Sequence, residues 1–191
     1  IQPLSTRFHD RSISSVQIAR TIHAIPKNRG NFLVFFPSYQ FLRMVMDELE
    51  EFEEPSKILV QNQGMSEQER EDFLSAFEED LDIPVIGFTV LGGIFSEGID
   101  LVGNRLSGVI IIGVGLPQLN EERNLIRDYY HSNGKNGFDY AYVYPGMNKV
   151  LQAAGRLIRS EQDTGMLTLI DDRFLTDKYR SLFPEMWSQF K

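Results

Sequence analysis

The chain has 191 residues, a formal net charge of −8 at pH 7, and a hydrophobic content of 42%. This length suits one large domain with ample apolar material for a core. There is no cysteine, which excludes disulfides, thiolate metal sites and iron–sulfur ligands within these residues. The histidines His9, His23 and His131 lie far apart in sequence, so we expect no metal site.

No stretch approaches the roughly 20 apolar residues of a membrane span. The most apolar run, residues 109–114, has the length of a strand. No secretory signal opens the chain, and its first residue is Ile1 rather than Met. These features predict a cytoplasmic location. They also predict that residues 1–191 are a single domain, a fragment of a longer chain.

Acidic residues are concentrated at 47–54 and 67–82, which we interpret as solvated outer faces of helices. Net acidity argues mildly against nucleic-acid binding, because a basic patch is the usual footprint of such a site. It remains compatible with a local basic groove.

Short apolar runs alternate with amphipathic stretches along the chain. After a leading strand-plus-helix element (1–27), we expect strands at 31–36, 57–61, 83–89, 108–113, 140–144 and 166–170. We expect helices at 39–52 (capped by Ser38), from a capping box at 66–69 to about 80, at 121–131 and at 148–160. A turn-rich loop covers 133–137, and the tail from Arg173 forms short helices anchored by Trp187.

Continuously apolar strands that alternate with helices indicate a mostly parallel sheet covered on both faces, which is a doubly wound α/β domain. Ligands of such sheets gather outside the carboxyl ends of the strands. The loops after the first, third and fifth expected strands are therefore the candidates for a site.

Two common phosphate-binding motifs are missing from the sequence. Gly93 and Gly98 have the spacing of a phosphate loop, but Ile99 follows where lysine is needed. The glycines at 113–115 do not continue as a dinucleotide fingerprint. By itself, the domain thus has no evident means of binding a nucleoside triphosphate and magnesium.

The strongest positive signal is residues 152–159. Gln152, Arg156 and Arg159 fall on one face of the expected helix, opposite a face of apolar side chains. Gly155 costs roughly 1 kcal/mol in a helix interior relative to alanine, so we expect a close backbone approach there. A plain surface helix with two solvated arginines is the alternative.

Two further segments follow expected strands. Residues 92–100 offer flexible glycines with Ser96, Glu97 and Asp100, and the alternative is an ordinary glycine-rich turn. At 35–39 a strand meets a helix N-terminus, whose N–H groups and the Ser38 hydroxyl suit a phosphate. Simple capping by Ser38, and packing rather than base stacking by Tyr39, are the alternatives there.

Together and in this order, the three segments resemble helicase motifs IV, V and VI of superfamily 2. The wording is closest to the DinG/XPD branch: LVFFPSY, FSEGID and QAAGRLIR, with DDRF at 171–174 after the last strand. The resemblance covers nearly the whole chain and implies the second of two RecA-like domains. The first, N-terminal helicase domain would carry the phosphate loop, the magnesium-binding motif and any iron–sulfur cluster.

The resemblance also implies roles for individual residues. ATP, with its Mg²⁺, would lie between the two domains, and Arg156 and Arg159 would act as arginine fingers. Gln152 would hold the γ-phosphate or the attacking water. Gly98 and Asp100 would contact the nucleotide, Asp100 near the ribose, and Glu97 would couple the loop to the nucleotide or orient an arginine.

Single-stranded DNA would cross both domains. The motor would move along it in the 5′ to 3′ direction that is typical of this branch. The DNA contacts would come from Ser38, Tyr39 and the loop that runs from Thr89 to Ser96. Asp171 would hold an arginine of the motif helix. Few phosphate contacts would make DNA binding by this domain alone weak and sensitive to salt.

Two other classes of function compete with a motor half. One is a RecA-like module that binds a partner or nucleic acid without hydrolysis, which the intact arginine pair disfavours. The other is a small-molecule α/β enzyme, against which the missing phosphate loop and dinucleotide fingerprint argue. The sequence therefore favours half of a helicase motor.

Overall fold

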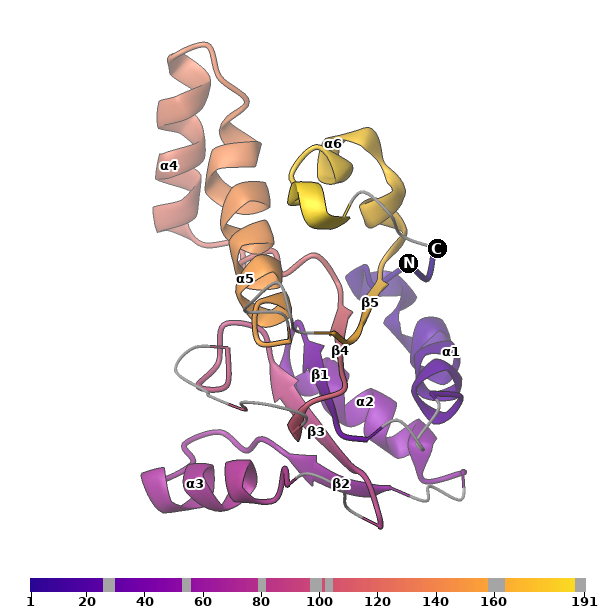
Figure 1. Ribbon diagram of the computed structural model, residues 1–191. Coiled ribbons are helices and arrows are strands. Elements are labelled where there is room, and N and C mark those ends of the chain that lie inside the picture. Colours follow the sequence, from indigo (N-terminus) through magenta and orange to yellow (C-terminus); the bar gives the residue numbers. More distant parts are fainter. Residues whose placement is uncertain are drawn as a thin grey trace.

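The computed structural model describes residues 1–25, 30–52, 56–78, 82–96, 101, 105–157 and 164–187. Within them, a five-stranded sheet has the order β2-β3-β1-β4-β5, and every pairing is parallel (Figure 1). The strands are β1 (Phe32–Phe36), β2 (Lys57–Val60), β3 (Val85–Val90), β4 (Gly108–Ile112) and β5 (Met166–Ile170). The expected doubly wound parallel α/β fold is confirmed.

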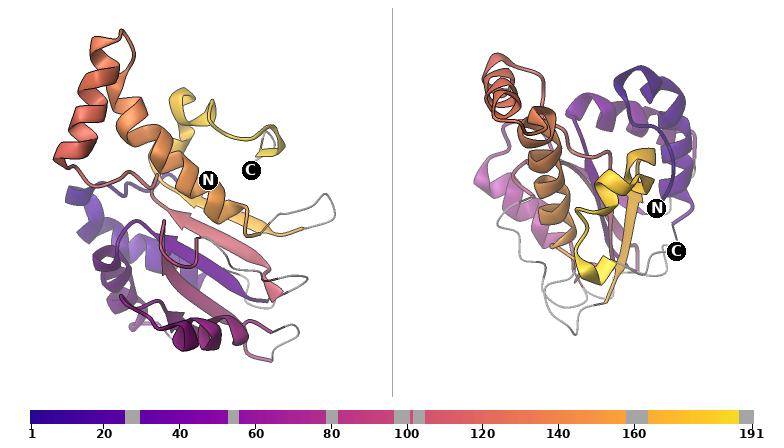
Figure 2. Two further views of the ribbon diagram at one scale, coloured as in Figure 1. Left: turned by 90° about the vertical axis from the view of Figure 1, so that its left-hand side faces the viewer. Right: turned by 90° about the horizontal axis from the view of Figure 1, so that it is seen from above.

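Helices cover both faces of this sheet (Figure 2). The α-helices are α1 (Arg11–His23), α2 (Tyr39–Leu49), α3 (Glu67–Ser75), α4 (Glu121–Ser132), α5 (Tyr144–Ala154) and α6 (Asp177–Arg180). Shorter turns are η1 (Phe8–Asp10), η4 (Asp139–Val143), η5 (Asp172–Leu175) and η6 (Glu185–Trp187). The buried side chains of α1 and α2 join one core, and those of α3 and α5 join the other.

Strand β1 shows why the strands are continuously apolar. All five of its side chains are buried, because alternate residues enter opposite cores. Leu33 and Phe35 pack with the α3 and α5 side, whereas Phe32, Val34 and Phe36 pack with the α1 and α2 side. Such a strand has no polar face, and it occupies the centre of the sheet.

The start of α3 confirms the capping box expected from the sequence. Ser66 accepts a hydrogen bond from the backbone of Glu69, and the Glu69 carboxylate accepts one from the backbone of Ser66 at 2.7 Å. The backbone hydrogen bond from Ser66 is the main reason that the pKa of Glu69 is lowered. Helices α2 and α3 end earlier than expected, at Leu49 and Ser75.

The strand expected at 140–144 is wrong. These residues form the π-helical turn η4 and the first residue of α5. The alternation of tyrosines with Ala141 and Val143 imitates a strand, but the rings meet at helical spacing. Tyr140 lies against Tyr144 with centroids 5.1 Å apart, and Phe138 stacks on Tyr142 at 5.0 Å.

Helix α4, η4 and α5 form a hairpin that projects from the sheet (Figure 1). No residue of α4 is buried. The loop predicted at 133–137 joins the two arms, and Gly134 adopts a φ of 74° there. Tyr130 stacks on Tyr140 across the hairpin with ring centroids 4.0 Å apart. Aromatic contacts therefore hold α4, which has no buried residue, against the arm formed by η4 and α5.

The two ends of the described chain lie against the sheet. The leading strand expected before α1 is reduced to one bridge, between Gln2 and Ile170. Trp187 packs on Phe183 with ring centroids 5.3 Å apart, which confirms its anchoring role. Among the helices of the described residues, none is long and apolar enough to cross a membrane.

Candidate functional site

Ser38 caps α2 at the carboxyl end of β1. Its hydroxyl accepts a hydrogen bond from the Phe41 N–H at 3.2 Å, and its backbone is extended. The capping expected for Ser38 is confirmed. A contact between this helix start and a phosphate stays a prediction.

Arg11 places a cation beside Ser38. Its guanidinium approaches the Ser38 hydroxyl at 3.5 Å and lies over the Phe41 ring, 4.8 Å from the centroid. Burial and, to a smaller extent, the nearby charge of Arg173 lower the pKa of Arg11. The start of α2 therefore has positive charge next to it, which sequence reasoning missed.

Tyr39 is half-buried and is held by a residue from β2. The side chain of Gln61 donates to the Tyr39 hydroxyl at 2.8 Å and accepts from the Val90 N–H at 3.0 Å. Burial raises the pKa of Tyr39, and the bond from Gln61 partly offsets this. Gln61 is itself 3% exposed, so its side chain connects the start of α2 to the end of β3 inside the domain.

The loop after β3 is closed by its own polar groups. Thr89 is fully buried, and its hydroxyl donates to the Val34 carbonyl at 3.3 Å. Ser96 is also fully buried. Its hydroxyl accepts from the Gly92 N–H at 2.8 Å and donates to the Val90 carbonyl at 3.3 Å. Both hydroxyls thus face inward, and the accessible groups of this loop lie elsewhere.

Four predicted site residues, Glu97, Gly98, Asp100 and Arg159, lie outside the described residues. Their expected roles stay predictions. Ser96, which is described, is the residue that leads into the first three of them.

The helix expected at 148–160 begins earlier, at Tyr144, and ends at Ala154, so Arg156 lies in the turn after it. We call Lys149 and Gln152 of α5, together with Arg156, the α5 face. Gln152 is exposed, whereas Lys149 and Arg156 are half-buried. Val150, Ala153 and Ala154 point into the core beneath them, as expected for an amphipathic helix. Lys149 was missed by sequence reasoning and lies over the loop after β3. A Cβ added to Gly92 would come within 3.0 Å of the Lys149 Cε and 3.3 Å of its Nζ.

The close approach expected at Gly155 is wrong. Gly155 is the exposed C-cap residue of α5, and an added Cβ would meet only carbonyls of its own helix, at 3.3 Å or more. The approach occurs instead at Gly146, where an added Cβ would lie 2.6 Å from the Val114 carbonyl. The backbone of α5 is thus held against the end of β4 by its first turn.

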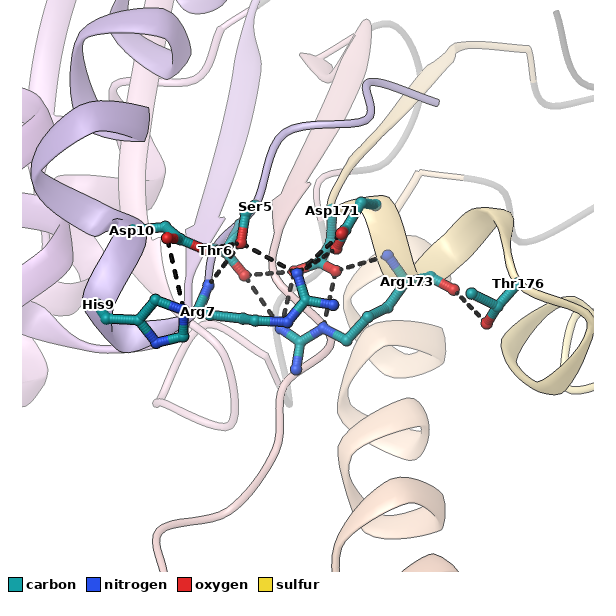
Figure 3. Close-up of polar contacts among 9 residues, drawn as sticks. Ser5, Thr6, Arg7, His9, Asp10, Asp171, Arg173 and Thr176 are labelled. Carbon is teal, nitrogen blue, oxygen red and sulfur yellow. Dashed lines mark hydrogen bonds and ion pairs between the residues drawn. The ribbon is translucent and has the colours of Figure 1, made fainter.

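Asp171 does not hold an arginine of the motif helix among the described residues. It is fully buried and takes two hydrogen bonds from the Arg173 guanidinium, each 2.8 Å long (Figure 3). Thr6 also donates to it. Arg7 makes two further bonds to Asp172, at 2.8 and 2.9 Å. These five residues, the β5 network, attach the start of the chain to the end of β5.

Three of the predicted segments meet on one side of the sheet. The Leu91 N–H donates to the Phe36 carbonyl at 2.8 Å, which joins the loop after β3 to the end of β1. Lys149 brings α5 to the same loop. The missed residues Gln61, Arg11 and Lys149 belong to no motif, and each acts through a contact distant in sequence.

Comparison with known proteins supports a single family. The model of the helicase C-terminal domain matches residues 19–190. The chain is 30% identical to the ATP-dependent DNA helicase DinG of Photobacterium profundum over 100% of this chain and 27% of that protein. It is also 30% identical to the ATP-dependent DNA helicase chl-1 of Caenorhabditis elegans, over 92% of this chain and 22% of that protein.

A solved structure described as an XPD helicase has the same fold. It superposes with a TM-score of 0.72 at 23% sequence identity, over 94% of this chain and 32% of that one. The chain thus spans less than a third of the length of these relatives. The small-molecule enzyme alternative is removed by the family match. The chain belongs to the helicase C-terminal domains, as the second RecA-like domain of a DinG/XPD-like superfamily 2 helicase.

Proposed function

We propose that this domain supplies half of the ATP hydrolysis site of a DNA helicase. The α5 face is the observation that carries the proposal. It sets Gln152 on the exposed side of α5, whose other side is anchored in the core, and Arg156 in the turn that directly follows the helix. Amide and guanidinium donors in this position suit the oxygens of a phosphoryl group bound by a facing domain.

In the proposed complex, ATP and Mg²⁺ are held mainly by the N-terminal helicase domain. Arg156 and Arg159 stabilise the charge that develops on the transferring phosphoryl group, and Gln152 orients the γ-phosphate or the attacking water. Glu97, Gly98 and Asp100 meet the nucleotide from the loop after β3. The relatives named as ATP-dependent DNA helicases support this reading of the full protein.

We further propose that single-stranded DNA contacts the domain at the starts of α2 and of the loop after β3. Ser38 and Tyr39 are half-buried and are the accessible candidates, and Thr89 and Ser96 act by shaping the loop, since their side chains are buried. Arg11 and Lys149 add local positive charge there. The stretch 11–46 contains no acidic residue, which reconciles an acidic chain with a DNA contact.

Movement is proposed to run 5′ to 3′ along DNA, as the resemblance implies, in a cytoplasmic protein. The alternative is a RecA-like module that binds nucleic acid or protein without hydrolysis. A motor half and a binding module differ in one respect. Only the motor half has a residue whose loss stops turnover but leaves DNA binding intact.

The isolated chain tests the proposal directly. Purified residues 1–191 are expected to show no ATPase activity, with or without single-stranded DNA, because the triphosphate and magnesium are bound by the other domain. The full-length protein, assayed under the same conditions, is the positive control. DNA-stimulated turnover by the isolated chain would refute the division of the site between two domains.

A further inference from the structure

Gln61 occupies a position that no helicase motif in this sequence explains. It follows β2 at the edge of the sheet, and its backbone N–H donates to the Phe88 carbonyl at 2.8 Å. Its side chain is directed inward, with 3% of the residue exposed. A buried amide needs hydrogen-bond partners, and Gln61 finds them at the first residue of α2 and at the last residue of β3, which lead into the two segments proposed to bind ligands.

The two hydrogen bonds have a fixed polarity. A backbone N–H can only donate, so the atom of Gln61 that faces Val90 N, 3.0 Å away, is the carbonyl Oε1. The amide nitrogen must then be the atom that donates to the Tyr39 hydroxyl at 2.8 Å. That hydroxyl keeps its own proton for an outward donor bond. Burial raises the pKa of Tyr39, so the proton is retained at neutral pH.

The loop after β3 is fitted closely around this amide. A Cβ on Gly93 would lie 2.8 Å from Nε2 and 3.2 Å from Oε1 of Gln61. The Gly93 N–H donates to the Val90 carbonyl, and the Ser96 N–H donates to the Gly93 carbonyl, both at 2.9 Å. A shift of the amide therefore displaces Gly93 or breaks the bond to Val90, and Ser96 is bonded to the same turn.

We propose that Gln61 is a positioning residue that couples DNA contact at Tyr39 to the loop carrying the nucleotide-facing residues. The inference rests on the proposed function, which assigns DNA to the start of α2 and nucleotide to residues 97–100. When the Tyr39 hydroxyl gains or loses an acceptor outside the domain, its position changes, and the Gln61 amide that is bonded to it moves with it. The amide transmits the change to the turn at 90–96. Gln61 itself touches neither DNA nor nucleotide.

The test uses the full-length protein with the variants Gln61→Met and Gln61→Glu. Methionine has a similar length and forms neither hydrogen bond. Glutamate still accepts from the Val90 N–H, but it also accepts the proton of the Tyr39 hydroxyl, which can then no longer donate outward. ATP turnover is measured at saturating ATP against the concentration of an oligothymidylate, together with the affinity for that DNA. Gln63→Met is the matched control, because Gln63 is exposed and two residues away.

For Gln61→Met, DNA stimulation of turnover is expected to fall about 5- to 10-fold, at the low end of the range of measured couplings. The DNA-free rate should change less than about 2-fold, well below that coupling. Gln61→Glu should lower the stimulation as well, because the Tyr39 proton then points inward, and Gln63→Met should retain all of it. Tyr39→Phe should lower stimulation by the same factor as Gln61→Met, and the double variant no further, because both break one link.

Unchanged stimulation in Gln61→Met would overturn the inference. So would an equal loss of DNA-free and DNA-stimulated rates, which indicates a structural defect, and so would additive losses in the double variant. Thermal unfolding identifies a variant that fails to fold, and Gln61→Glu and Tyr39→Phe then decide. Wild-type protein without DNA-stimulated turnover would refute the proposed function itself, and the coupling with it.

Discussion

Charged side chains have opposite environments in the β5 network and on the α5 face. In the network, Asp171 is fully buried and both of its oxygens are bonded by Arg173. On the α5 face, Gln152 is exposed, and Lys149 and Arg156, the latter in the turn after the helix, are half-buried. The network binds its charged groups to one another within the domain, whereas the α5 face is proposed to offer donors to a phosphoryl group bound by a facing domain.

This difference teaches where to expect stability and where to expect activity. A charge that is buried and paired contributes to folding and costs much when its partner is removed. A surface cation contributes little to folding, so its removal is felt only when a ligand or another domain arrives. Substitutions in the two regions should therefore separate unfolding from turnover.

The largest effect is expected from Arg159→Ala in the full-length protein. Loss of a finger that neutralises the developing phosphoryl charge should lower the DNA-stimulated kcat by roughly 10³-fold. Affinity for single-stranded DNA should survive, because the finger lies on the nucleotide side. Steady-state turnover and fluorescence anisotropy with labelled DNA measure the two quantities. Normal turnover in this variant would refute the finger role.

The next effect belongs to the β5 network. Asp171→Ala removes the partner of a mostly buried guanidinium and should lower the free energy of unfolding by about 3–5 kcal/mol. Denaturant unfolding of the domain measures this, and Asp82→Ala is the control, because Asp82 is exposed and should change stability by less than about 0.5 kcal/mol. A loss below about 1 kcal/mol, as for an exposed pair, would contradict the structural role.

The sequence was most informative where local rules decide the structure. The Ser38 cap, the capping box at Ser66 and the strands at 57–60 and 166–170 follow from short-range patterns, and all are present. The segment 140–144 failed because alternation of tyrosines with small apolar residues satisfies a strand pattern. Stacking of Tyr130 on Tyr140 across the hairpin favours the helix, and no window of adjacent residues contains that contact.

The candidate site also has features that local sequence patterns predict and features that they do not. The three motifs were found from sequence, but the orientation of their side chains was not. Thr89 and Ser96 were expected to face DNA, and instead the Thr89 hydroxyl bonds to β1 while the Ser96 hydroxyl closes the loop from inside. Gln61 and Arg11 reach the site from other elements, so their roles depend on packing between α2, β2, β3 and the chain start.

A pair of glycine variants tests how α5 is held. Gly146→Ala should destabilise the domain by about 1–3 kcal/mol, since its Cβ would strike the Val114 carbonyl at 2.6 Å. An alanine Cβ at Gly155 would meet only two carbonyls of its own helix, at 3.3 Å or more, and the backbone there is right-handed, so the stability of Gly155→Ala should change by less than about 1 kcal/mol or rise slightly. Thermal unfolding of both variants makes the comparison. Equal destabilisation would mean that both glycines are packed.

The smallest effect is a pH dependence within the β5 network. Burial alone raises the pKa of Asp172, but the hydrogen bonds and charge of Arg7, with Asp171 and Arg173, outweigh it and lower the pKa. An acid with a lowered folded pKa stabilises the protein above its unfolded value, about 3.9. That contribution is lost as the pH falls through the folded pKa.

Asp172→Asn removes this titration. Because the Asp172 side chain is 41% exposed, the variant should lose only about 0–1 kcal/mol at neutral pH. The difference between wild type and variant should shrink below about pH 4, where the wild-type carboxylate becomes protonated. Denaturant unfolding from pH 7 to pH 3 follows both proteins. A difference that stays constant across this range would show that Asp172 acts through its shape rather than its charge, and the pair with Arg7 would then contribute nothing to folding.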